Sequence, residues 1–174
     1  MRAGFILVVL AGVLTNASAT DSPAEEYRVK GAFLLNFTKF VEWPATAWKA
    51  PGDPISICVL GGSPFTPALD QAAKELVVAN RQVAVSPVVD LQMAHKCQIV
   101  FVPVSERKRA RALIDAVKGE SVLTVGESEG FIASGGIVEF RVEDSKVRME
   151  INAESAKRAG LHVSAKLLSL SQKR

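Results

Sequence analysis

The chain has 174 residues, with 21 basic and 18 acidic side chains and a formal net charge of +3 at pH 7. Without residues 1–19, which include Arg2, the net charge falls to +2; so small an excess selects no class of partner and argues against nucleic acid. The 155 residues that remain match the size of one domain that buries its own core.

The amino-terminal residues have the pattern of a secretory signal peptide. Arg2 precedes an unbroken apolar run from Phe5 to Leu14, and Ala17-Ser18-Ala19 supplies small residues for cleavage. The run is far shorter than the roughly 20 residues that a membrane-spanning helix needs. We therefore expect residues 1–19 to be removed after Ala19 and residues 20–174 to be exported as one domain.

A long helix is predicted next. Ser22-Pro23-Ala24-Glu25 forms a capping box, and Trp43-Pro44 ends the helix because the residue before a proline is pushed out of helical geometry. Apolar residues recur at helical spacing between these limits, which indicates core packing. The outer edge of this stripe, near Phe40 and Trp43, is an alternative partner or dimer surface. The stripe consists of Val29, Phe33, Phe37, Phe40 and Val41.

The middle of the chain alternates strand-like and helix-like segments. Strands are predicted at 55–60, 82–89, 98–104 and 121–126, with helices at 64–78 and 105–118, the second capped by Ser105. Short apolar runs without alternation are typical of strands covered on both faces, so this part indicates a mainly parallel sheet. Arg107, Arg111 and Lys118 share a polar helix face, which is expected to be solvated or, alternatively, to hold an acidic partner.

After residue 126 the pattern changes to that of an antiparallel hairpin. Residues 135–142 and 146–151 alternate apolar and polar side chains around a turn at 143–145. Asn152 is a cap for a short helix that Gly160 ends, and 161–170 is one more amphipathic, helical segment. The predicted fold is α/β: a single domain whose mixed sheet, mainly parallel with a C-terminal antiparallel hairpin, is flanked by helices.

The two cysteines, Cys58 and Cys97, form an even count in an exported chain, which favours one structural disulfide. A disulfide between them would close a loop of about 40 residues, which adds about 4 kcal/mol to the free energy of unfolding in the chain-entropy model. No CxxC redox pair is present, and neither His95 nor His162 has zinc-ligand spacing to the thiols. We expect no metal.

The sequence offers little for catalysis. Gly61-Gly62-Ser63-Pro64 follows a strand but fits neither the dinucleotide nor the phosphate-loop pattern, so a tight turn is the simpler interpretation. His95 and His162 are isolated, and Glu127 with Glu129 forms a carboxylate pair that no second element completes; a loop of solvated charges is the default for the pair. We expect no enzyme, no catalytic residue and no cofactor.

Several separated stretches together resemble the YfiR-like (HmsC-like) family of exported bacterial regulators. Residues 26–44 resemble the family's opening helix, which ends on Trp43-Pro44. The later stretches follow in the family's order, and the likeness covers nearly the whole mature chain. They are residues 57–61, 97–102, 123–127, 130–131, 135–138, 148–152 and 159–168.

The resemblance implies a periplasmic protein without catalytic activity. Family members repress a membrane-bound diguanylate cyclase by binding its periplasmic sensor domain, which lowers cyclic di-GMP signalling and biofilm formation. The resemblance also implies homodimers and sequestration by an outer-membrane, peptidoglycan-binding lipoprotein. Cys58 and Cys97 fall where the family has a disulfide; a second pair that some members carry near the C-terminus has no counterpart here.

The candidate partner surface is the C-terminal hairpin and last helix, with Glu150, Leu161 and Leu168, together with Phe131 in the loop before the hairpin. The alternative for the apolar members is that they close the core. The rival function is a periplasmic small-molecule sensor that acts on another membrane receptor such as a histidine kinase. Its ligand would bind at the ends of the strands, near Gly61-Gly62-Ser63 and Gly126-Glu127.

Overall fold

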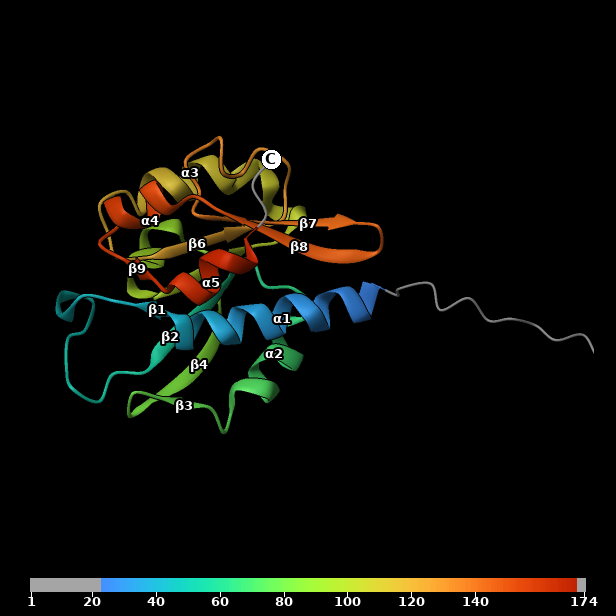
Figure 1. Ribbon diagram of the computed structural model, residues 1–174. Coiled ribbons are helices and arrows are strands. Elements are labelled where there is room, and N and C mark those ends of the chain that lie inside the picture. Colours follow the sequence, from blue (N-terminus) through green and yellow to red (C-terminus); the bar gives the residue numbers. More distant parts are fainter. Residues whose placement is uncertain (1–22, 172–174) are drawn as a thin grey trace, which may run out of the picture.

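The structure is a computed structural model that describes residues 23–171 (Figure 1). The expected signal peptide and the capping residue Ser22 lie outside these residues. The first helix, α1 (Pro23–Phe40), begins at the proline that was expected in its first turn. It passes directly into β1 (Val41–Glu42), just before the predicted stop at Trp43-Pro44.

The centre of the fold is a seven-stranded sheet in the order β3-β4-β2-β5-β6-β7-β8. The five strands from β4 to β7 in this order are parallel, while β8 is antiparallel to β7 and β3 is antiparallel to β4. This arrangement confirms the predicted mixed sheet with a C-terminal hairpin. The strands are β2 (Ile55–Leu60), β3 (Val77–Val78), β4 (Arg81–Val88), β5 (Ile99–Val102), β6 (Leu123–Gly126), β7 (Val138–Glu143) and β8 (Lys146–Ile151).

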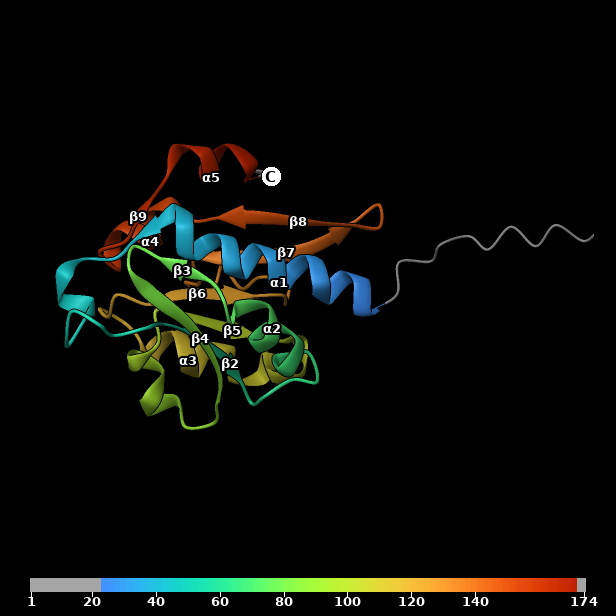
Figure 2. The same ribbon diagram turned by 90° about the horizontal axis from the view of Figure 1, so that it is seen from below.

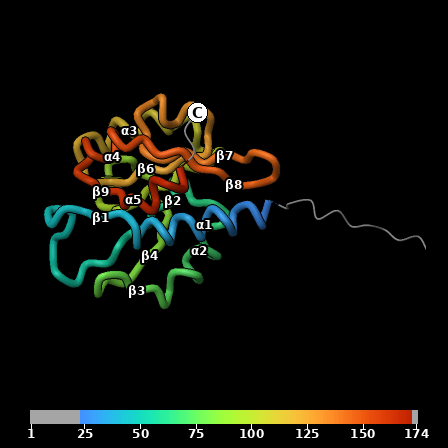
Figure 3. Tube along the Cα trace, in the orientation of Figure 1, coloured from blue at the N-terminus to red at the C-terminus, as the bar shows by residue number. Residues whose placement is uncertain are grey.

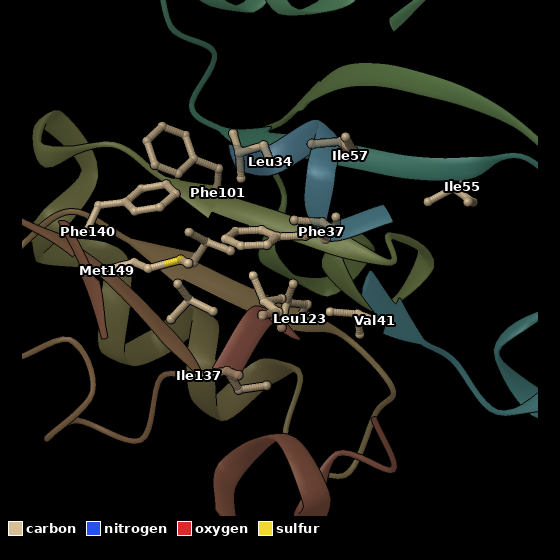
Figure 4. Packing of buried hydrophobic residues seen from close by; sticks show 14 of the residues in the cluster. Leu34, Phe37, Val41, Ile55, Ile57, Phe101, Leu123, Ile137, Phe140 and Met149 are labelled. Atoms are coloured by element: carbon tan, nitrogen blue, oxygen red, sulfur yellow. The ribbon is translucent and has the colours of Figure 1, made fainter. Parts of the chain in front are cut away.

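Helices cover both faces of the sheet (Figures 1 and 2). The long α1 and the shorter α2 (Thr66–Ala73) pack on one face, and α3 (Ala110–Ala116) packs on the other. Each face carries its own hydrophobic core, and Figure 4 shows the core on the α1 side. There the centroid of the Phe140 ring lies 6.0 Å from that of Phe37 and 6.3 Å from that of Phe101. No helix within residues 23–171 is both long and apolar enough to span a bilayer.

The end of the chain returns to the end of α1, which Figure 3 follows along the trace. The helix α4 (Ala153–Arg158), capped by Asn152 as expected, leads to β9 (His162–Val163), which pairs with β1 as a second small sheet. Ser164 then caps α5 (Ala165–Leu170), and its amide donates to the Phe40 carbonyl at 2.9 Å. The predicted segment 161–170 is therefore a short strand followed by a helix.

Two predicted helices have different limits in the structure. The segment 64–78 is helical only in α2, because a tight turn at Ala79-Asn80, both with positive φ, pairs Val77–Val78 with β4. The segment 105–118 begins as a 3₁₀ helix, η3 (Val104–Arg109), before α3. Ser105 does not cap it, because Pro103 holds that position.

Phe131 explains why β7 begins at Val138 instead of 135. Its ring lies against Gly126 and Gly136, and a side chain at either glycine would overlap it. The chain turns around this ring: Gly135 has a φ of 101°, and the Gly136 amide donates to the Phe131 carbonyl at 3.0 Å, so Gly135-Gly136 stays outside the sheet. The ring is part of the core on the α3 side, with 2% of the residue exposed.

Candidate functional site

A buried ionic group, the Glu127 cluster, lies where β6 ends. It consists of Glu127, Lys30, Glu26, Tyr27 and the amide of Val104. Lys30 pairs with both Glu127 and Glu26, and the side chains of Lys30 and Glu127 are only 4% and 3% exposed. The Tyr27 hydroxyl and the Val104 amide donate to Oε1 of Glu127 at 3.0 and 2.6 Å. Both oxygens of this carboxylate thus accept hydrogen bonds inside the protein, Oε1 from two donors and Oε2 from Lys30.

The Glu127 cluster corrects one prediction. Glu127 was placed with Glu129 in a loop of solvated charges, but only Glu129 is exposed. The reason is that α1 crosses the sheet and brings Lys30 over the end of β6. Sequence reasoning missed Lys30. The spacing of four residues between Glu26 and Lys30 is a signal for an ion pair between these two side chains on one helix face.

Burial and the neighbouring Glu127 carboxylate raise the pKa of Tyr27 to about 12 from 10.0. The folded protein thus binds this proton more tightly than the unfolded chain. The contribution of Tyr27 to the free energy of unfolding is therefore constant below pH 10 and is lost as the pH rises from 10 to about 12. Tyr27 is the single tyrosine of the chain, so absorbance at alkaline pH reports it alone. We expect a titration midpoint near 12 in native buffer and near 10 in denaturant; a native midpoint near 10 would contradict the hydrogen bond to Glu127.

The glycine turn after β2 is closed to anions. Gly61 and Gly62 both have positive φ, and the Glu106 side chain packs directly on Gly61. Arg109 holds that carboxylate at 3.1 Å. A phosphate at this turn would face a negative group, so the structure agrees with the interpretation as a tight turn.

An apolar groove, the α1–α2 groove, remains open beside this turn. It has a volume of about 610 Å³, and the Tyr27 ring stacks on Phe65 at 5.2 Å along its floor. Small exposed residues, including Ala32 and Ala68, form its rims. Its lining includes Pro64, which follows Gly61-Gly62-Ser63, and Tyr27, which bonds to Glu127, so it adjoins the region in which the rival small-molecule function places its ligand.

The predicted partner residues separate into buried and accessible ones. Phe131 and Leu161 are core residues, so the alternative that they close the core describes them in this structure. Trp43 is half-buried, and its indole Nε1 donates to the Gln98 carbonyl at 3.2 Å. Phe40 is half-buried at the end of α1, and Leu168 is exposed.

Phe40 at the end of α1 and the accessible residues of α5 are treated together as the C-terminal surface, which we define as Phe40, Lys166, Leu168 and Leu170. Lys166 lies over the Phe40 ring at 5.2 Å, and Leu167 points into the core, so that α5 is held firmly against α1. Leu170, which was not predicted, is 58% exposed. Two leucines and a phenylalanine beside a cation are a suitable composition for protein binding.

The Glu150 side chain points to the sheet face opposite the core that holds Met149 and Leu167, and it is engaged. It accepts from Arg141 Nη1 at 2.6 Å, and Glu139 and Glu143 also pair with the same guanidinium. The hydrogen bond to Glu150 is the main reason why the pKa of Arg141 is raised above its ordinary value. Ser171 Oγ accepts from the Ile151 amide at 2.9 Å and so brings the end of α5 to the end of β8.

The cysteines, the basic helix face and the histidines were also singled out in the sequence. Cys58 and Cys97 form the expected disulfide, which joins β2 to the residue after η2 (Leu91–Lys96). Arg107, Arg111 and Lys118 are exposed, as expected for a solvated face. His95 and His162 are both exposed and lie on separate elements.

Comparison with known proteins identifies the family. The family model described as YfiR/HmsC-like matches residues 27–172. The chain belongs to the YfiR/HmsC-like family. This is a family of periplasmic regulators that are not catalysts, and the match confirms the resemblance stated above.

A solved structure shows the same kind of fold. It is the crystal structure of a conserved domain protein from Vibrio cholerae O1 biovar El Tor, with a TM-score of 0.52 at 13% sequence identity. The alignment covers 68% of this chain and 54% of that one, so the YfiR/HmsC-like chain spans about half the length of the Vibrio protein. At this identity the likeness concerns the fold alone.

Proposed function

We propose that this protein is a periplasmic regulator that binds the periplasmic sensor domain of an inner-membrane diguanylate cyclase and represses it. Membership of the YfiR/HmsC-like family over residues 27–172 is the observation that carries the proposal. The Glu127 cluster supports it, because the carboxylate at the strand ends is already used to hold α1. Repression lowers cyclic di-GMP and biofilm formation, and sequestration by an outer-membrane, peptidoglycan-binding lipoprotein relieves it.

Repression of this kind requires differential affinity and no chemistry. A regulator that binds the inactive sensor conformation more tightly shifts the population toward it. A tenfold shift needs only about 1.4 kcal/mol of preference, which a few apolar side chains supply on burial. The C-terminal surface offers Phe40 at the end of α1, and Leu168 and Leu170 on α5, for this purpose.

The test uses the mature chain, residues 20–174, and the periplasmic region of a membrane-bound cyclase encoded beside it. We expect a complex in calorimetry, and lower cyclic di-GMP in cells that express both proteins. Absence of a complex in both oxidising and reducing buffer, with no change in cyclic di-GMP, would refute the proposal.

The double variant Leu168→Glu/Leu170→Glu is expected to weaken this complex by at least about tenfold, because two charges replace apolar contacts at the interface. Both side chains are exposed, so folding should be kept. The matched control is Val77→Glu/Val89→Glu, which places the same charges on exposed valines of other elements. Equal affinities for the two double variants would remove the C-terminal surface from the interface.

The α1–α2 groove favours a second candidate, a small-molecule sensor that acts on another membrane receptor such as a histidine kinase. Its volume of about 610 Å³ lies within the usual range of ligand sites. A thermal-shift screen of apolar periplasmic metabolites tests it. Stabilisation that Ala68→Trp, a substitution that fills the groove, abolishes would support this function.

A further inference from the structure

The strand β8 is the last of the large sheet, and part of its outer edge has no partner. The amide of Asn152 donates to the Ile137 carbonyl, which fixes the alternation: even-numbered residues of β8 bond to β7. The backbone groups of Val147, Met149 and Ile151 therefore point outward. Ser171 takes the amide of Ile151, and Met149 is only 2% exposed, so its outward groups are covered. Val147 is half-buried, and no described residue bonds to its outward amide and carbonyl, which are therefore the accessible part of this edge. Figure 2 shows the hairpin extending beyond α5 at this edge.

A hollow of about 450 Å³ adjoins the free edge on the side of α1. Val29 and Phe33 of α1 face Val142 and Val147 of the hairpin across it. Val142 is 51% exposed, so the space is open at the tip of the hairpin, where Glu25, Glu26, Ser145 and Lys146 also line it. An apolar side chain on a neighbouring strand would fit beside Val147, because side chains of paired strands that share a face lie next to one another.

The opposite face of the hairpin carries charged side chains of both signs. Glu139, Glu143 and Glu150 all pair with Arg141. Lys146 and Arg148, which lie on the same face as Arg141, make no ion pair within residues 23–171. The charges of this face sum to zero, but on the edge strand β8 itself Lys146 and Arg148 outnumber Glu150. Acidic side chains on a strand beside β8 would complement these two cations.

We propose that β8 is a docking edge to which a partner protein adds one extended strand with alternating apolar and acidic side chains. The apolar residues enter the hollow beside Val147, the acidic residues meet Lys146 and Arg148, and the outward amide and carbonyl of Val147 bond to the strand. The inference deepens the proposed function, since it assigns the strand to the sensor partner. A second copy of the chain suits the edge less well, because a symmetric pair centred on Arg148 sets like charges opposite one another.

The first experiment measures binding of the cyclase's periplasmic region to Val147→Pro, which removes an outward-pointing amide from the edge. Its matched control is Val142→Pro, because Val142 is the cross-strand neighbour, lines the same hollow and points away from the β8 edge. We expect Val147→Pro to bind at least about tenfold more weakly than Val142→Pro. Equal binding by the two variants would overturn the docking edge, whereas failure of the wild-type chain to bind concerns the proposed function.

A charge reversal keeps the test decisive if the proline variants unfold. Lys146→Glu/Arg148→Glu is expected to weaken binding by about tenfold or more relative to Arg107→Glu/Lys108→Glu, which changes the net charge equally at exposed residues of η3. The same loss in both variants would show a general charge effect and contradict the proposal.

The second experiment needs no natural partner. The probe is a labelled peptide, Glu-Val-Glu-Phe-Glu-Val-Glu, with a lysine-for-glutamate version as its control. We expect the acidic peptide alone to shift the amide resonance of Val147. No shift at this amide, or concentration-dependent dimerisation through β8 without peptide, would overturn the inference even if the sensor domain binds elsewhere.

Discussion

Replacing Lys30 with methionine is expected to lower the free energy of unfolding by about 3–5 kcal/mol. The substitution leaves the Glu127 carboxylate buried at the end of β6 without its cation, although Tyr27 and the Val104 amide still donate to it. Methionine fills a similar space, so the loss reports the charge and not a cavity. Urea denaturation followed by circular dichroism measures it.

Two controls separate this effect from a general loss of helix stability. Lys39→Met makes the same change at an exposed lysine of α1 and is expected to alter the unfolding free energy by no more than about 0.5 kcal/mol. Lys30→Met/Glu127→Gln, which removes both charges, should recover much of the stability. The side-chain carbonyl of the glutamine can still accept from the Val104 backbone amide. Lys30→Met with wild-type stability would mean that the ion pair is not buried in solution.

The Glu127 cluster also shows where sequence reasoning ends. Periodicity alone identifies the parallel strands, because runs such as Ile55–Leu60 are apolar on both faces. Lys30 and Glu127 are 97 positions apart, and each is ordinary in its own segment. Their pairing depends on how α1 crosses the sheet, and no local pattern encodes that crossing.

Phe131 illustrates the same limit for the partner surface. An aromatic residue in a glycine-rich loop suggests an exposed contact, yet the ring is buried between Gly126 and Gly136. These two glycines were visible in the sequence, and their lack of side chains is what admits the ring. Leu170 was missed for the opposite reason: it continues the apolar pattern of the last segment but lies on the outer side of α5.

The helix α1 joins the buried cluster to the candidate interface. Lys30 is fixed in the first half of α1, while Phe40 at its end contributes to the C-terminal surface. A helix that is held at one end by a buried ion pair and at the other by the β1–β9 pairing presents Phe40 in one position. Such preorganisation reduces the entropy lost on binding, which suits a protein that acts by affinity alone.

Reduction of the Cys58–Cys97 disulfide is expected to lower the free energy of unfolding by about 4 kcal/mol. The bond closes a loop with a sequence separation of 39, which contains α2, β3 and β4, so the oxidised unfolded chain has far fewer conformations. Urea denaturation of the oxidised protein and of the same protein in dithiothreitol measures the difference without changing a residue.

Partner binding should respond differently to the same reduction. The disulfide lies in the core on the α3 side of the sheet, whereas Leu167, which anchors α5 and the C-terminal surface, packs in the core on the α1 side. Reduced protein that is still folded should therefore bind the sensor domain with unchanged affinity. A reduced, folded protein that loses binding would give the bond a regulatory role, because stability alone cannot change the affinity of molecules that remain native.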